Sequence, residues 1–307
     1  MRVLLIVLLT IFIIWIVFIL GPALTFYMMM FCRKKPLSYL NVVPEKAYFA
    51  GHEDHYHEVH DRLLAIPGKR ISMEAGDGTR LECDYLKNKG KKAAILLHGF
   101  RSDPYINFAG MGTILWDMGY DLYLVYARGH GDSKGSYTMG VKEQEDLLQW
   151  VDFIKKDYLP EKIVVGGISM GAVTTAYVSD RLEGVNALII DCGGESPYEQ
   201  LCSEMRKRHL PWRLLIPVIR ICGMLHLKKD IKIPVSTSLS QTTIPTIFIH
   251  GQADQTISAE LGIRNYESCA SKKELILVPD APHTAALTVG GDTARTAFEN
   301  FIINCEN

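Results

Sequence analysis

Six short, continuous apolar runs between residues 93 and 278 constrain the fold of this chain more than any other sequence feature. A continuous apolar run of three to five residues is typical of a strand that is buried on both faces. Helical patterns fall between the runs, as where Leu147, Val151 and Ile154 recur at helical spacing among charged residues. Alternating strands and helices predict a mostly parallel, doubly wound α/β sheet. The runs are residues 93–97, 122–125, 163–165, 187–190, 247–249 and 275–278.

Two further strands are expected ahead of this sheet, at residues 69–75 and 79–86. They are joined by Gly76-Asp77-Gly78, whose residues tolerate positive φ, and this turn predicts an antiparallel hairpin. At about residues 196–243 the alternation is interrupted by helical patches with several prolines and no clean strand. Long excursions of this kind often form lids or binding walls, so we expect a helical cap, with a purely structural helical pair as the alternative. Residues 61–307 are thus predicted to form one α/β domain with a cap insertion.

The amino-terminal segment from Val3 to Phe31 contains no charged residue and consists mostly of Leu, Ile, Val, Phe and Met. A helix of that length is about 40 Å long, enough to cross a bilayer. The apolar core of a cleavable signal peptide is only about 7–15 residues long, so the run favours an uncleaved transmembrane anchor at residues 1–31. We expect Gly21-Pro22 to end its first straight segment. Residues 32–60 are predicted to be a juxtamembrane linker.

Flanking charges predict the orientation of this anchor. Arg2 precedes the apolar run, whereas Arg33, Lys34 and Lys35 follow it. Because Lys and Arg concentrate on the cytoplasmic side of a membrane, we expect a single-pass protein whose large domain lies in the cytoplasm. The reversed topology is the alternative, since long domains can be translocated regardless of small charge differences. Seven cysteines without a CxxC pair agree with a reducing compartment and argue against a disulfide framework or a zinc finger. With 33 basic and 34 acidic residues, the chain has no field that would attract nucleic acid.

The strongest local signal is Gly167-Ile168-Ser169-Met170-Gly171, which follows the third apolar run and precedes a helical stretch. A G-x-S-x-G sequence between a strand and a helix places its serine on a strained turn, with the hydroxyl above the sheet. The glycines allow neighbouring backbone segments to pass close by. This setting predicts Ser169 as a nucleophile.

A serine nucleophile needs an imidazole base and a carboxylate that orients the imidazole. The fifth apolar run ends in His250-Gly251-Gln252-Ala253-Asp254, which places Asp254 in the loop after a strand. A loop-capping role near Ser258 is the alternative for this carboxylate. His283 follows the last run and is the only histidine after Asp254. Asp280, beside this histidine, is the rival carboxylate.

Hydrolysis also requires N–H donors for the oxyanion of the tetrahedral intermediate. The residue after the nucleophile supplies one donor, and a loop after an earlier strand supplies the other. We therefore predict the backbone N–H groups of Met170 and Phe100 as the oxyanion hole. The side chain of His98 is expected to fix the loop that carries Phe100.

Several motifs, taken in order, resemble those of the bacterial membrane-anchored α/β-hydrolases, a group that includes serine aminopeptidase-like and lysophospholipase-like enzymes. The likeness covers about residues 60–305 and is shared with animal α/β-hydrolase-domain proteins. It implies that Ser169, Asp254 and His283 form a catalytic triad. Relatives usually have an Asp before RGHG and a Gly after the late histidine, whereas this chain has Tyr126-Ala127 and Thr284, which affects pocket shape rather than the triad. The motifs are His98-Gly99-Phe100, Arg128-Gly129-His130-Gly131-Asp132-Ser133, Gly167-Ile168-Ser169-Met170-Gly171, Asp191-Cys192-Gly193, His250-Gly251-Gln252-Ala253-Asp254 and His283.

Residues 52–61 contain four histidines and four carboxylates, a composition that can ligate a divalent metal ion. The segment lies ahead of the sheet and has no HExxH spacing, so a solvated linker helix is the preferred interpretation. We expect no metal and no cofactor.

The main functional hypothesis is hydrolysis of carboxylic esters or thioesters through an acyl-enzyme intermediate. The anchor and the cap favour a small-molecule or lipid-like ester as the substrate. A proline-type aminopeptidase would use the same triad, and a catalytically silent, membrane-tethered binding module is the third hypothesis. The sequence predicts neither the physiological substrate nor an oligomeric state.

Overall fold

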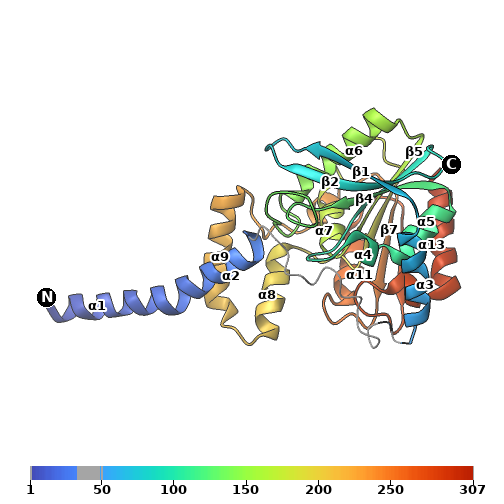
Figure 1. The fold of residues 1–307 in the computed structure, drawn as a ribbon. Helices are drawn as coiled ribbons and strands as arrows, with labels where there is room; N and C mark the ends of the chain where they lie inside the picture. Colours follow the sequence, from blue (N-terminus) through green and yellow to red (C-terminus); the bar gives the residue numbers. More distant parts are fainter. Residues whose placement is uncertain (1, 33–48, 50, 307) are drawn as a thin grey trace.

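A computed structural model describes residues 2–32, 49 and 51–306 of the 307-residue chain (Figure 1). The predicted basic segment Arg33-Lys34-Lys35 and most of the predicted linker lie outside the described residues. The strands of the central sheet are β1 (Gly68–Glu74), β2 (Arg80–Leu86), β3 (Lys92–Leu97), β4 (Tyr120–Tyr126), β5 (Lys162–Ile168), β6 (Ala187–Asp191), β7 (Thr246–Gly251) and β8 (Lys273–Val278).

These eight strands form one sheet in the order β1-β2-β4-β3-β5-β6-β7-β8. The pairs β1–β2 and β2–β4 are antiparallel, and every other neighbouring pair is parallel. The predicted fold class, a mostly parallel sheet with an amino-terminal hairpin, is therefore confirmed. Gly78 has a φ of 77° in the hairpin turn, the left-handed conformation that glycine adopts most readily. Consecutive parallel strands bring their carboxyl ends to one edge of the sheet.

Helices cover both faces of this sheet (Figure 1). Alternate residues of β3 point to opposite faces, so Ala94 and Leu96 join one apolar core while Ile95 and Leu97 join the other. The helices that follow the amino-terminal helix are α3 (Glu53–Leu64), α4 (Pro104–Asn107), α5 (Ala109–Asp117), α6 (Glu143–Tyr158), α7 (Met170–Val178), α8 (Pro197–Lys207), α9 (Trp212–Leu227), α10 (Ser236–Leu239), α11 (Ala259–Ser268), α12 (Ala286–Val289) and α13 (Gly291–Glu306).

The helix α3 differs from the solvated linker helix that we expected at residues 52–61. Its side chains Tyr56, Val59 and Leu63 are buried, and the helix packs against α5. These three residues follow the i, i+3, i+7 spacing of a helix with one apolar face. The segment is thus packed on the α/β domain, with its charged residues on the outer face.

The amino-terminal helix is continuous from Arg2 to Phe31 and is long and apolar enough to cross a membrane. It consists of α1 (Arg2–Trp15), the π-helical turn η1 (Ile16–Leu20) and α2 (Gly21–Phe31). The first α-helical segment ends at Trp15, ahead of the boundary expected at Gly21-Pro22, and the helix continues through the proline. The N–H of Gly21 bonds to the carbonyl of Ile16, five residues earlier, and this wider turn accommodates the proline that follows.

The two halves of this helix have different surroundings. No residue of α1 is buried, and α1 projects away from the body of the protein (Figure 1). By contrast, α2 packs against α9. It forms an apolar core with α8 and α9 in which Phe26, Tyr27 and Met30 contact the segment between β6 and β7. The region where we predicted a cap, residues 196–243, is thus joined to the amino-terminal helix.

Candidate active site

Ser169 occupies the sharp turn between β5 and α7. Its φ of 55° and ψ of −112° lie outside the regions that a residue with a Cβ ordinarily adopts. The turn is so tight that only glycine fits at positions 167 and 171. A Cβ at Gly171 would overlap the carbonyl oxygen of Leu97, and a Cβ at Gly167 would overlap the backbone of Gly171. The two glycines therefore allow β3, β5 and α7 to approach closely enough to present the serine.

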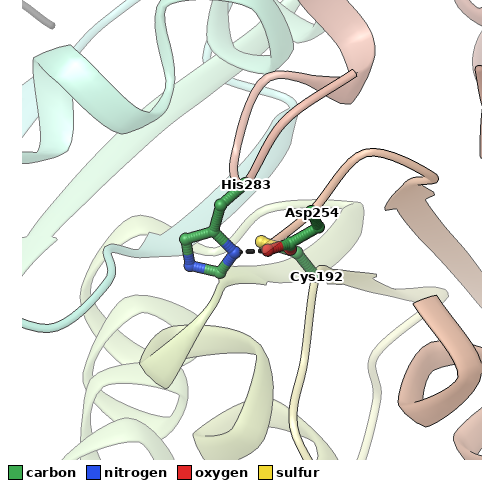
Figure 2. Close-up of side chains that lie close together, drawn as sticks. All are labelled: Cys192, Asp254 and His283. Carbon is green, nitrogen blue, oxygen red and sulfur yellow. Dashed lines mark hydrogen bonds and ion pairs between the residues drawn. The ribbon is translucent and has the colours of Figure 1, made fainter. Parts of the chain in front are cut away.

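The three residues predicted as nucleophile, acid and base lie together at the carboxyl edge of the sheet. His283 Nε2 is 3.0 Å from Ser169 Oγ, and His283 Nδ1 is 2.6 Å from Asp254 Oδ2. Figure 2 shows the imidazole of His283 directed at the carboxylate of Asp254. Asp280, the rival carboxylate, is exposed at a turn. The arrangement can move a proton from the serine to the imidazole.

Asp254 is buried, and four hydrogen-bonded groups surround its carboxylate. Oδ1 accepts bonds from the N–H groups of Thr256, at 2.7 Å, and Ile257, at 2.9 Å. Burial alone raises the pKa of Asp254, but hydrogen bonds with His250 and His283 outweigh it and hold the pKa below the ordinary value of 3.8. The carboxylate therefore stays charged and can stabilise a protonated imidazole.

A second histidine, which sequence reasoning did not single out, lies behind Asp254. His250 Nε2 is 3.3 Å from Asp254 Oδ2 and 2.9 Å from the carbonyl oxygen of Ile257. Burial lowers the pKa of His250, but these partners outweigh it and raise the pKa above the ordinary value. Burial also raises the pKa of nearby Asp191 to about 7. The sequence feature that could have indicated a role for His250 is its position at the end of a buried strand, four residues before Asp254.

Phe100 and Met170, the predicted oxyanion donors, line the same cavity as Ser169 and His283. Met170 is the first residue of α7, where a backbone N–H has no acceptor within the helix and the dipole favours negative charge. The loop of Phe100 is held by His98, whose Nδ1 donates to the carbonyl of Gly99 and whose Nε2 accepts from Ala127 N–H. His98 thus fixes this loop by hydrogen bonding, as expected.

His130 holds the next residue of this loop, because its Nε2 accepts a 2.9 Å hydrogen bond from the backbone N–H of Arg101. Burial lowers the pKa of His130 to about 4 and that of His98 to about 3. Both rings are neutral at pH 7, as their roles as acceptors at Nε2 require.

We expect the stability of the protein to fall as the pH drops from about 6.5 towards 4. Unfolded histidines take up protons below about 6.5, whereas folded His98 and His130 stay neutral, so protons bind preferentially to the unfolded chain. His130→Gln should make the dependence of unfolding free energy on pH shallower by about 1.4 kcal/mol per pH unit in this window. Urea unfolding in detergent at several pH values would measure it. Equal slopes for wild type and His130→Gln would contradict the expectation.

Among the residues that the structure describes, one group offers three metal-ligating atoms within 4.8 Å of one another: Cys192, Asp254 and His283. Figure 2 shows the sulfur of Cys192 beside the carboxylate. Burial raises the pKa of the Cys192 thiol well above its ordinary value, which keeps the sulfur protonated and a poor ligand. The imidazole is already bonded on both nitrogens. The donor set therefore fits proton transfer better than metal binding.

A cavity of about 310 Å³ opens above Ser169 and His283. One side of it is formed by Phe26, Met29 and Met30 of the amino-terminal helix. We had not predicted this contribution, because an all-apolar helix does not reveal which of its faces packs on protein. The other lining residues are Phe100, Arg101, Met139, Met170, Val173, Gly194, Ser196, Pro197, Gln200, Glu204, Arg208, Thr256 and Ile257.

Comparisons with known proteins give a family model, related sequences and solved structures of similar fold. A family model described as serine aminopeptidase, S33, matches residues 88–214. The uncharacterized protein YfhR of Escherichia coli O157:H7 is 26% identical over 248 residues, which are 77% of this chain and 81% of that protein. Lysophosphatidylserine lipase ABHD12 of Danio rerio is 26% identical over 178 residues, 53% of this chain and 43% of the lipase. The solved esterase Pf2001 of Pyrococcus furiosus, 23% identical, superposes with a TM-score of 0.65 over 79% of this chain and 93% of its own.

Proposed function

We propose that this chain hydrolyses carboxylic esters or thioesters through an acyl-enzyme on Ser169. It has the α/β-hydrolase fold and matches the S33 serine aminopeptidase family model over residues 88–214. The observation that carries the proposal is the continuous hydrogen-bonded path from Ser169 Oγ through His283 to Asp254. The named relatives include an esterase and a lipase, which favours an ester over other acyl compounds.

In the proposed reaction, His283 Nε2 takes the proton of Ser169 as Oγ bonds to the acyl carbonyl carbon. The negative charge that develops on the carbonyl oxygen is stabilised by the N–H groups of Phe100 and Met170. His283 then gives its proton to the leaving alcohol or thiol as the ester bond breaks. A water molecule, deprotonated by the same imidazole, attacks the acyl-enzyme and releases the acid, which restores Ser169.

A fluorophosphonate probe, which phosphonylates activated serines, tests this proposal. We expect wild type to be labelled and Ser169→Ala to remain unlabelled, because the probe needs the hydroxyl that His283 activates. Ser196→Ala is the matched control, since Ser196 also lines the cavity but caps α8 through Glu199 N–H. Equal labelling of wild type and Ser169→Ala would refute the proposal.

Hydrolysis of peptide amides is the second candidate, because the matching family model is named for serine aminopeptidases. The same three side chains would act on an aminoacyl amide, with an amine in place of the alcohol as leaving group. The two candidates are separated by comparing kcat/KM for aminoacyl amides with kcat/KM for the corresponding acyl esters. The ester proposal expects a strong preference for the ester.

We further propose that the amino-terminal helix is a single-pass membrane anchor and that the catalytic domain faces the cytoplasm. The exposed apolar surface of α1 and η1 supports the first point, and the Lys and Arg residues after the helix support the second. Protease protection in sealed inside-out vesicles tests the orientation, since a cytoplasmic domain would be digested from outside.

A further inference from the structure

The wall of the catalytic cavity that α2 provides belongs to the same continuous helix as the proposed anchor. Phe26, Met29 and Met30 line the cavity together with Ser169 and His283. The lining is apolar on this side, and Met29 keeps 40% of its surface exposed, so part of this wall is accessible to a ligand. The anchor is therefore a component of the site as well as a tether.

Specific polar contacts hold α2 in this position. The carbonyl oxygen of Met29 accepts hydrogen bonds from Arg101 Nη2, at 3.2 Å, and from Tyr137 Oη, at 3.1 Å. The last carbonyls of a helix have no partner within it, and a cation there complements the helix dipole. Tyr27 Oη also lies 2.8 Å from His226 Nδ1 of α9. Because Arg101 directly follows Phe100, the end of the anchor is bonded to the loop proposed to supply the oxyanion hole.

The cavity residues contributed by α8 have a different character. Gln200, Glu204 and Arg208 line the cavity from α8 and its end, and their four-residue spacing places them on one face of that helix. Gln200 Nε2 is 3.4 Å from Glu204 Oε1, and Arg208 Nη2 is 3.8 Å from Glu204 Oε2. The cavity thus has one apolar wall and one polar wall that carries both donors and acceptors.

We propose that α2 is the acyl-binding wall of the active site and that Met29 determines the acyl chain length accepted. The substrate is an amphiphilic ester, with its acyl chain along Phe26 and Met29 and its polar group facing α8. This inference rests on the proposed function, because it assigns a substrate to the same serine. The inference also places the site at the membrane surface. Together α1 and η1 are about 28 Å long, which is close to the thickness of the hydrocarbon core of a bilayer, so α2 would lie in the interfacial region beyond that core.

Met28 and Met29 offer a matched pair of positions for the test. Both belong to α2 and both are exposed, at 62% and 40%, but only Met29 lines the cavity. Full-length Met29→Trp and Met28→Trp would be compared with wild type in detergent micelles, using nitrophenyl butyrate and nitrophenyl laurate. We expect Met29→Trp to lower the ratio of kcat/KM for laurate to kcat/KM for butyrate by at least about tenfold, because the indole fills the chain site. Met28→Trp should keep the wild-type ratio.

Met29→Ala is a milder second variant, which keeps the test valid if Met29→Trp misfolds. It should raise the same laurate-to-butyrate ratio, because the smaller side chain leaves more room for the acyl chain. Fluorophosphonate labelling of each variant reports on the serine independently of chain length. An unchanged ratio in both Met29 variants, with labelling and butyrate hydrolysis retained, would overturn the inference and leave the proposed function standing. Absence of ester hydrolysis and of labelling in wild type would overturn both.

Discussion

Replacing Asp254 by asparagine is expected to lower kcat by about 10⁴-fold while leaving the fold intact. The N–H groups of Thr256 and Ile257 hold the oxygen at the Oδ1 position, so the amide of the new side chain would direct its NH₂ group at His283 Nδ1. His283 Nδ1 would then have to accept, its proton would move to Nε2, and Nε2 could no longer take the proton of Ser169. Steady-state hydrolysis of a nitrophenyl ester, with circular dichroism as the check on folding, measures the effect.

Asp280→Asn is the matched control for this experiment. Asp280 is exposed and has a φ of 57°, a conformation that asparagine also tolerates, so the backbone should be unaffected. We expect its kcat to stay within about twofold of wild type, as for most exposed substitutions. If Asp280→Asn lost activity and Asp254→Asn kept it, the assignment of the acidic residue would be wrong.

The second large effect is expected from Gly171→Ala, which should strongly destabilise the native fold. The new Cβ would occupy the position of the Leu97 carbonyl oxygen, and that carbonyl belongs to β3 in the middle of the sheet. Neither β3 nor α7 can move away without breaking the sheet or the turn at Ser169. We expect a loss of more than about 4 kcal/mol of unfolding free energy, beyond the range of ordinary substitutions.

Gly76→Ala provides the comparison, because a Cβ at Gly76 would meet only the Gln149 side chain, at an ordinary distance of 3.6 Å. Its unfolding free energy should change by less than about 1 kcal/mol. Urea unfolding of both variants in detergent, followed by tryptophan fluorescence, makes the comparison. A Gly171→Ala protein as stable as Gly76→Ala would show that the turn can relax, contrary to the close approach described here.

The sheet could be predicted from the sequence because its determinants are local. A strand buried on both faces must be apolar along its length, and each predicted run lies within a strand of the structure or matches it. The turn of Ser169 could be predicted for the same reason, because its two glycines are required by close contacts among the strand and helix next to it. His98 was also interpretable, because a histidine at the end of a buried strand needs partners for its nitrogens.

Other features depend on contacts that leave no local pattern. A helix that is apolar on every side has no distinct face, so nothing in residues 21–31 indicated that Phe26 and Met29 line a cavity. His250 ends a buried strand as His98 does, but that position does not identify the partner of its imidazole, which the structure places behind Asp254. For α3 the signal was present but weak, since three apolar residues at helical spacing stood among four histidines and four carboxylates.

With the amino-terminal helix as the proposed membrane anchor, its continuity would couple the catalytic domain to the thickness of the bilayer. No loop separates the exposed segment of α1 and η1 from the segment that Arg101 and Tyr137 bind, so the tilt of the helix is transmitted to the catalytic domain. Helices answer a thinner or thicker bilayer by tilting or by deforming the lipid around them. We therefore expect the height and angle at which the cavity meets the lipid headgroups, and with them the rate at which amphiphiles reach Ser169, to vary with lipid composition at constant substrate concentration.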